Sequence, residues 1–108
     1  MDIFTKNDID SYIDSLVNQA FSILPIFEES GNSDFLSRKI DNLCMRMQGF
    51  FELNNFDHSI AIEILSFTNS LKMLHKHSEI RKRVLKICSM LSSLKVVNQY
   101  DFGLLSIN

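Results

Sequence analysis

The sequence contains little proline and little glycine. Pro25 is the one proline among 108 residues, and there are three glycines. β-Sandwiches and barrels join many short strands through turns, and those turns draw on both residue types. Their scarcity predicts few, long elements, which means helices. At this length we expect a single domain with a core of its own, because 45% of the residues are hydrophobic.

Cysteines are also few. Cys44 and Cys88 fall on the apolar faces of separate predicted helices, so we expect buried free thiols in a reducing compartment. The stretch 1–8 lacks the apolar run of a signal peptide, and no window approaches the length of a membrane span. These observations predict a cytoplasmic protein.

The net charge of −2 hides an uneven distribution. Residues 1–36 hold seven acidic residues and one lysine, whereas residues 72–95 hold seven basic residues and one glutamate. Such a division indicates either pairing of the two regions within the fold or a charged surface for a partner.

Apolar residues recur at helical spacing of three and four in four stretches. Pro25 should kink or end the first helix, because it lacks an amide hydrogen and crowds the preceding turn. Ser33 and Asp57 are suitable caps for the second and third helices, and Ser78 for the fourth. The predicted helices lie near residues 7–29, 33–53, 57–75 and 78–97.

The boundary between the third and fourth helices has an alternative. The stretch 75–78 has neither glycine nor proline, so one continuous helix over 57–96 would also fit. A gap in the apolar pattern between Leu74 and Ile80 favours two helices. The fold class is then all-α: one domain spanning 1–108, arranged as a four-helix antiparallel bundle or an α-α array. We expect the apolar tail 98–108 to pack back on the bundle or to contact a partner.

Enzymatic patterns are weak. His75 and His77 are two residues apart and would diverge on a helix, so they do not form a paired metal site. The glycines stand apart and form no phosphate-binding loop, and both cysteines have core-type neighbours, unlike reactive thiols. We expect no enzymatic activity, no cofactor and no metal.

The third helix is apolar almost all round, which is typical of a central helix or an interface. Some of its apolar residues lie off the main stripe, and the fourth helix adds basic residues. The sequence therefore predicts a small cytosolic protein-protein interaction module of adaptor, chaperone, immunity or inhibitor type. Its partner would be an acidic or amphipathic protein, or a second copy of the chain in an oligomer. The predicted partner-binding residues are Ile62, Leu65, Met73, Lys82, Arg83 and Lys86.

The basic cluster Arg81-Lys82-Arg83-Lys86 also allows an alternative function, a small regulator that binds nucleic acid. Against it, the chain is acidic overall and the cluster has no interleaved aromatic residues. The basic cluster could equally pair with the acidic first helix.

Overall fold

The computed structural model describes the backbone of residues 6–107 and the side chains of residues 6–95. Every element of this backbone is helical, and it contains no strand. In chain order the elements are α1 (Lys6–Phe21), α2 (Ile23–Ser30), α3 (Asp34–Leu53), α4 (His58–Asn69), the 3-10 helix η1 (Ser70–Met73) and α5 (His77–Ile107).

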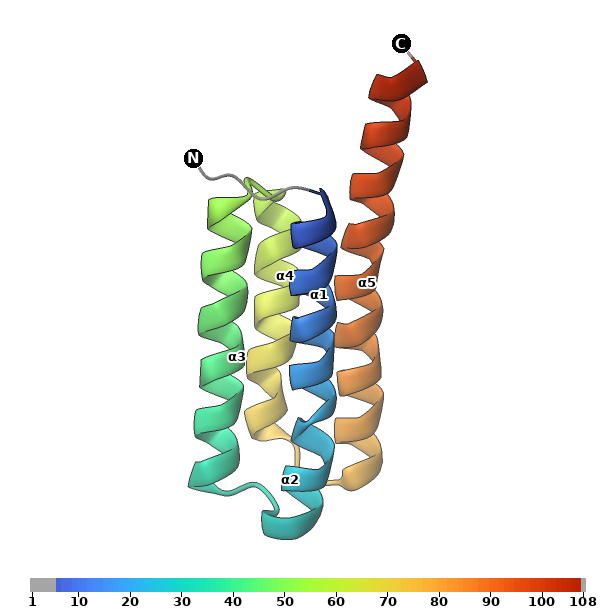
Figure 1. The fold of residues 1–108 in the computed structure, drawn as a ribbon. Helices are drawn as coiled ribbons and strands as arrows, with labels where there is room; N and C mark the ends of the chain where they lie inside the picture. Colours follow the sequence, from blue (N-terminus) through green and yellow to red (C-terminus); the bar gives the residue numbers. More distant parts are fainter. Residues whose placement is uncertain (1–5, 108) are drawn as a thin grey trace.

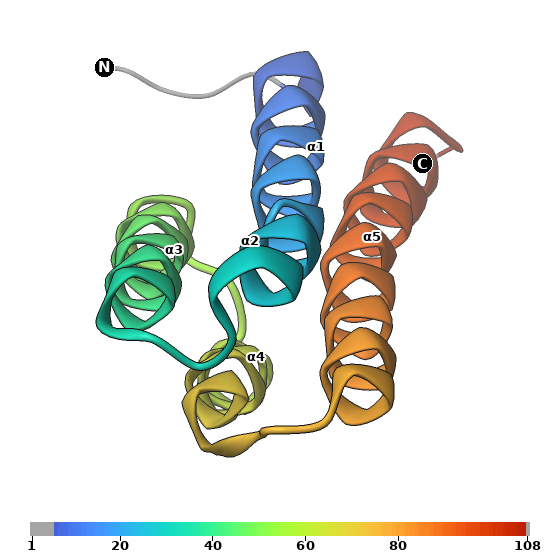
Figure 2. The same ribbon diagram turned by 90° about the horizontal axis from the view of Figure 1, so that it is seen from below.

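These elements form four rods whose chain direction alternates (Figure 1). The first rod is α1 with α2, and α4 with η1 forms the third. Seen from below, α3 and α5 lie at opposite corners of a four-cornered arrangement, as do α1 and α4 (Figure 2). Each rod contacts its two neighbours, and α1 makes its most extensive contact with α5. The all-α prediction is confirmed, and the arrangement is the antiparallel bundle.

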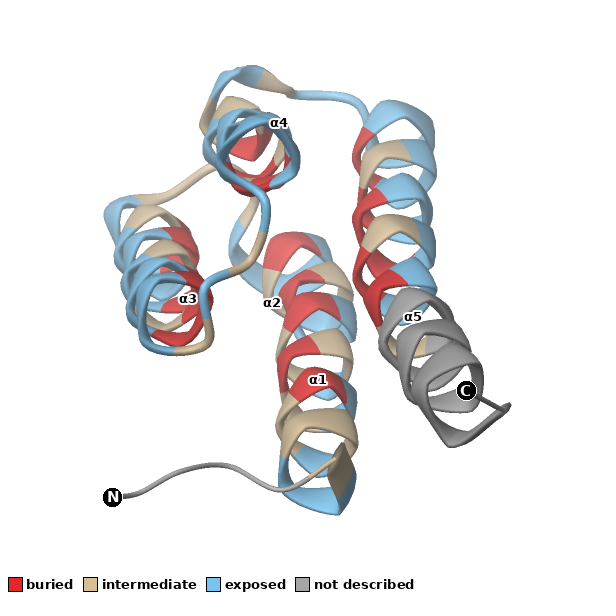
Figure 3. Ribbon diagram, turned by 90° about the horizontal axis from the view of Figure 1, so that it is seen from above, coloured by how far each residue is buried: buried red, intermediate tan, exposed pale blue. Residues whose placement is uncertain are grey.

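The core lies along the axis between the rods, where each helix turns its buried side inward (Figure 3). Thr68 is the one buried polar residue among the described side chains. Its hydroxyl donates to the Ile64 carbonyl oxygen at 2.8 Å, so the polar group is satisfied inside its own helix. The fully buried larger side chains are Ile13, Leu16, Ile23, Leu36, Ile40, Leu43, Met47, Ile64, Leu71, Ile80, Ile87 and Leu91.

The first rod is broken at Ser22, which is a turn between α1 and α2. Pro25 explains the position of the break, because it cannot donate to the carbonyl of Phe21 and its ring crowds that turn. The amide of Ser22 still bonds to the Asn18 carbonyl at 3.1 Å. The predicted break near Pro25 is confirmed.

Local signals end α2 and begin α3 and α4 as expected, whereas Ser78, the expected cap of the fourth helix, lies inside α5, which begins at His77. Gly31 adopts φ +63°, where a side chain would be strained, and closes α2. The Ser33 hydroxyl accepts from the Leu36 amide at 3.2 Å and caps α3. The Asp57 carboxylate accepts from the Ser59 amide at 2.8 Å, and from the next amide, to cap α4.

The junction between α4 and α5 is a true break, so the continuous helix over 57–96 is excluded. The α-helix ends at Asn69, earlier than the predicted residue 75, and tightens into η1. Residues 74–76 are not helical, and α5 begins at His77. The side-chain amide of Asn32 donates to the carbonyl oxygens of Lys72 and Leu74 at 2.7 and 2.8 Å. These bonds satisfy acceptors that the ending helix leaves open.

The last helix is longer than predicted. Its expected end near residue 97 is wrong, because α5 continues to Ile107 and extends past the other rods in Figure 1. The stretch 96–107 holds no proline, and the lone Gly103 is tolerated inside a helix at a modest cost. The expected contacts of the tail 98–108 concern side chains that lie outside the described residues.

Candidate functional site

The three apolar residues predicted to bind a partner differ in exposure. Ile62 of α4 is 49% exposed and Met73 of η1 is 77% exposed. Leu65 is half-buried and turns toward α3, where it lines a shallow hollow of about 290 Å³ with Cys44 and Gln48. The outer side of α4 and η1 thus presents two large apolar side chains, with the hollow at its edge.

Two of the three predicted basic residues lie free on the surface of α5. Lys82 and Lys86 are exposed, and their spacing of four residues places them on one face of the helix. Within residues 6–95, no ion pair involves either side chain. Their positive charge is therefore available to a partner.

Arg83 has a different environment. Its guanidinium carbon lies 5.1 Å from the ring centroid of Phe67, and it donates a hydrogen bond to the Ser70 hydroxyl. Both contacts are to the α4–η1 rod, and the Arg83 side chain is half-buried. The predicted binding residue is thus used within the bundle, where it joins α5 to α4.

The two oppositely charged regions of the sequence pair in part. Lys95 of α5 contacts Asp14 of α1 at 2.8 Å, and His77 contacts Glu28 of α2 at 3.0 Å. The hydrogen bond to Asp14 raises the pKa of Lys95. These pairs lie near the two ends of the α1–α2 contact with α5. They leave Lys82 and Lys86 between them without an acidic partner among the described residues.

The six predicted residues do not converge on one pocket. Ile62 and Met73 lie on the outer side of the third rod, and Lys82 and Lys86 on the exposed side of α5. These two rods are neighbours in the bundle (Figure 2). These residues line no common pocket, and an exposed surface that spans two rods suits a protein partner better than a small molecule.

Both cysteines are free thiols; Cys88 is buried as expected, whereas Cys44 is only half-buried. Burial raises the pKa of Cys88 to about 11, and its thiol faces the Val17 carbonyl at 3.8 Å. Burial also raises the pKa of Cys44. Both shifts favour the neutral thiol, which is the less reactive form. Among the described residues, no group of three or more metal-binding side chains comes together, and no helix is long and apolar enough to cross a membrane.

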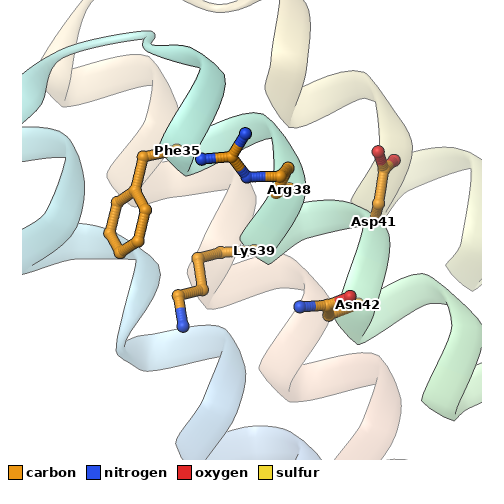
Figure 4. A pocket seen from close by; sticks show the side chains of 5 residues that line it. All are labelled: Phe35, Arg38, Lys39, Asp41 and Asn42. Carbon is orange, nitrogen blue, oxygen red and sulfur yellow. The ribbon is translucent and has the colours of Figure 1, made fainter.

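Sequence reasoning missed the outer side of α3. Phe35, Met45 and Leu53 are exposed to 49%, 70% and 67%. A second surface hollow, of about 360 Å³, lies on α3. Its lining residues, which begin at Phe35, are labelled in Figure 4 and all come from this helix. The sequence holds a signal for this surface: some apolar residues of α3, such as Met45, do not share the helical spacing of its core residues, such as Met47.

Sequence reasoning also missed the role of Arg46, which connects α3 to α1. Its guanidinium donates to the Ser15 hydroxyl at 3.0 Å and to the Gln19 side-chain oxygen, and it lies 4.9 Å from the Tyr12 ring centroid. Tyr12 in turn stacks on Phe50 with centroids 4.7 Å apart. No pattern within one helix signals this group, because its members come from two helices.

Comparisons of the chain with protein-family models, with curated proteins and with solved structures found no significant match.

Proposed function

We propose that this protein is a protein-binding module whose binding surface is the outer side of α4–η1 together with the exposed side of α5. The observation that carries the proposal is the pairing of apolar and positive groups on adjacent rods. Ile62 and Met73 expose apolar surface, and Lys82 and Lys86 have no acidic partner among the described residues. Apolar anchors beside unpaired cations favour an amphipathic, acidic partner.

The chemistry of the exposed side chains supports this choice. Met73 is unbranched and polarisable, so it can adapt to partners of different shape. Leu65 sits at the edge of the surface beside the hollow of about 290 Å³, which can accept one apolar side chain of a partner. A partner helix with acidic residues on one side could contact the lysines and the apolar residues at the same time.

The nucleic-acid alternative has less support. Arg83 is turned toward Phe67 and Ser70. Arg81 precedes Lys86 by five residues, so their side chains point roughly 140° apart around the helix. A phosphate backbone would then meet two lysines rather than four basic residues on one face. No measurable binding of duplex DNA, or binding that is unchanged by Lys82→Glu with Lys86→Glu, would remove this alternative.

Affinity capture from the native source, followed by sizing of the complex, tests the proposal. The bait carrying Ile62→Ser, Met73→Ser and Lys86→Glu should lose a protein that the wild-type bait retains. A matched control bait carries Phe21→Ser and Asn18→Glu, which remove apolar surface and add negative charge at exposed positions of α1. These positions lie outside α3 and outside the proposed surface, so the control bait should retain the protein. Equal capture by all three baits, or no captured protein at all, would contradict the proposed surface.

A further inference from the structure

The outer side of α3 carries a second candidate surface, separate from the one on α4–η1 and α5. We define the α3 outer face by six exposed residues: Phe35, Arg38, Met45, Gly49, Glu52 and Leu53. We propose that this face binds a second copy of the chain, with the two α3 helices antiparallel about a two-fold axis near Met45.

The spacing of three of these residues carries the proposal. Arg38, Met45 and Glu52 are seven residues apart from one another, and seven residues are almost two full helical turns. They therefore form one line along α3, with a cation at one end, an apolar side chain in the middle and an anion at the other. Within the described side chains, no ion pair involves Arg38 or Glu52.

This line is complementary to itself in one orientation. A parallel pair would place Arg38 beside the second copy's arginine and Glu52 beside its glutamate, which is repulsive. An antiparallel pair with Met45 at the axis places Arg38 opposite Glu52 of the other copy, twice by symmetry. The opposed helix dipoles favour the same orientation.

The apolar residues of the α3 outer face follow the same symmetry. With the axis at Met45, Phe35 lies opposite residue 55 of the other copy. Leu53 is two residues from that point, about 3 Å along the helix axis. The exposed Phe35 and Leu53 side chains can thus cover each other at both ends of the contact.

Gly49 allows the two α3 backbones to approach closely, because it has no side chain. It lies one turn after Met45, and a Cβ built there would meet nothing within 4 Å. The internal packing of the bundle therefore does not require a glycine, although glycine costs a helix about 1 kcal/mol relative to alanine. Beside it is an apolar hollow of about 190 Å³, lined in part by Met45, Gly49, Phe50 and Leu53. This hollow can receive the Met45 side chain of the second copy.

The size of the face sets the expected strength of the dimer. The 20 residues of α3 span about 30 Å at 1.5 Å per residue. One helix face of this length buries less than the roughly 1,200 Å² of a standard stable interface. We therefore expect a weak dimer, with a dissociation constant in the micromolar range or above.

Sedimentation of the purified full chain tests the proposal, over concentrations from about 10 μM to about 1 mM. The wild type should shift from monomer to dimer across this range. Arg38→Glu alone and Glu52→Arg alone should each weaken the dimer roughly tenfold or more, because each homodimer then holds two like-charged pairs. Circular dichroism checks that both exposed substitutions leave the helices intact.

The decisive sample is the mixture of the two variants. In a heterodimer of Arg38→Glu with Glu52→Arg, both ion pairs are attractive again, so the mixture should dimerise about as well as the wild type. Arg81→Glu is the matched control, since it makes the same charge change on α5, at the opposite corner of the bundle (Figure 2). A monomeric wild type at every concentration, or a mixture no better than its components, would overturn the proposal. A dimer equally weakened by Arg81→Glu would also overturn it.

Discussion

The side-chain amide nitrogen of Asn32 lies 2.8 Å from the carbonyl oxygen of Leu74, and 2.7 Å from that of Lys72. The three residues come from the α2–α3 loop and from the end of η1, more than a third of the chain apart. The Asn32 side chain therefore joins the α2–α3 loop to the segment between η1 and α5, at the same end of the bundle.

Replacing Asn32 with alanine should destabilise the fold by about 1–3 kcal/mol, because two half-buried carbonyl groups lose their donor. Urea unfolding followed by circular dichroism measures the change in the free energy of unfolding. Asn18→Ala is the matched control: the Asn18 side chain is exposed on α1, and its replacement should be neutral or slightly stabilising. Equal effects of the two substitutions would show that the Asn32 bonds contribute nothing to stability.

Arg83 and Arg81 should respond differently to the same substitution. Arg83→Ala removes the contact with the Phe67 ring and the hydrogen bond to Ser70, and should cost about 1–2 kcal/mol. Arg81 is exposed, so Arg81→Ala should change stability by less than about 0.5 kcal/mol. Thermal unfolding of both variants measures the difference. An Arg83→Ala protein as stable as wild type would mean that this side chain is free for a partner after all.

The buried Cys88 thiol should make the fold less stable in alkali. Burial raises its pKa from about 9 to about 11, so between these values the unfolded chain loses the proton and the folded chain keeps it. The unfolded state then binds fewer protons, and the free energy of unfolding falls as pH rises, by at most about 3 kcal/mol. Below about pH 8, where the thiol is protonated in both states, this group contributes little pH dependence.

Urea unfolding at about pH 8 and about pH 10.5 measures that decrease. Cys88→Ala removes the titrating group, so this variant should lose less stability between the two pH values than the wild type. The other ionisable groups, Cys44 among them, are present in both proteins, so their contribution cancels in the comparison. A decrease of the same size in both proteins would assign the alkaline effect to other groups.

The features that the sequence predicted correctly depend on residues that are close together along the chain. Pro25 acts on the turn before it, and Ser33 and Asp57 cap amides two or three residues away. The apolar repeat likewise identifies the buried side of each helix without reference to the others. The fold class followed from these local patterns.

The features that sequence missed depend on contacts between helices. Arg83 is one of three consecutive basic residues, and only the position of Phe67 on the neighbouring rod explains why it alone turns inward. The sequence around residue 97 holds neither proline nor glycine, so no local signal marks an end of α5 there. The exposed Met45 and Leu53 show that apolar character does not by itself place a residue in the core.

The contact between α1 and α5 has a consequence for synthesis of the chain. Of the described helices, α1 emerges from the ribosome first, yet its main packing partner α5 is made after all the others. Asp14 and Lys95, which join the two helices, are 81 residues apart. Until α5 has emerged, the apolar side of α1 can pack against α3 but lacks its contact with α5. Native packing of this bundle should therefore be completed only once α5 has emerged, and a nascent chain stalled before residue 77 should remain sensitive to proteases.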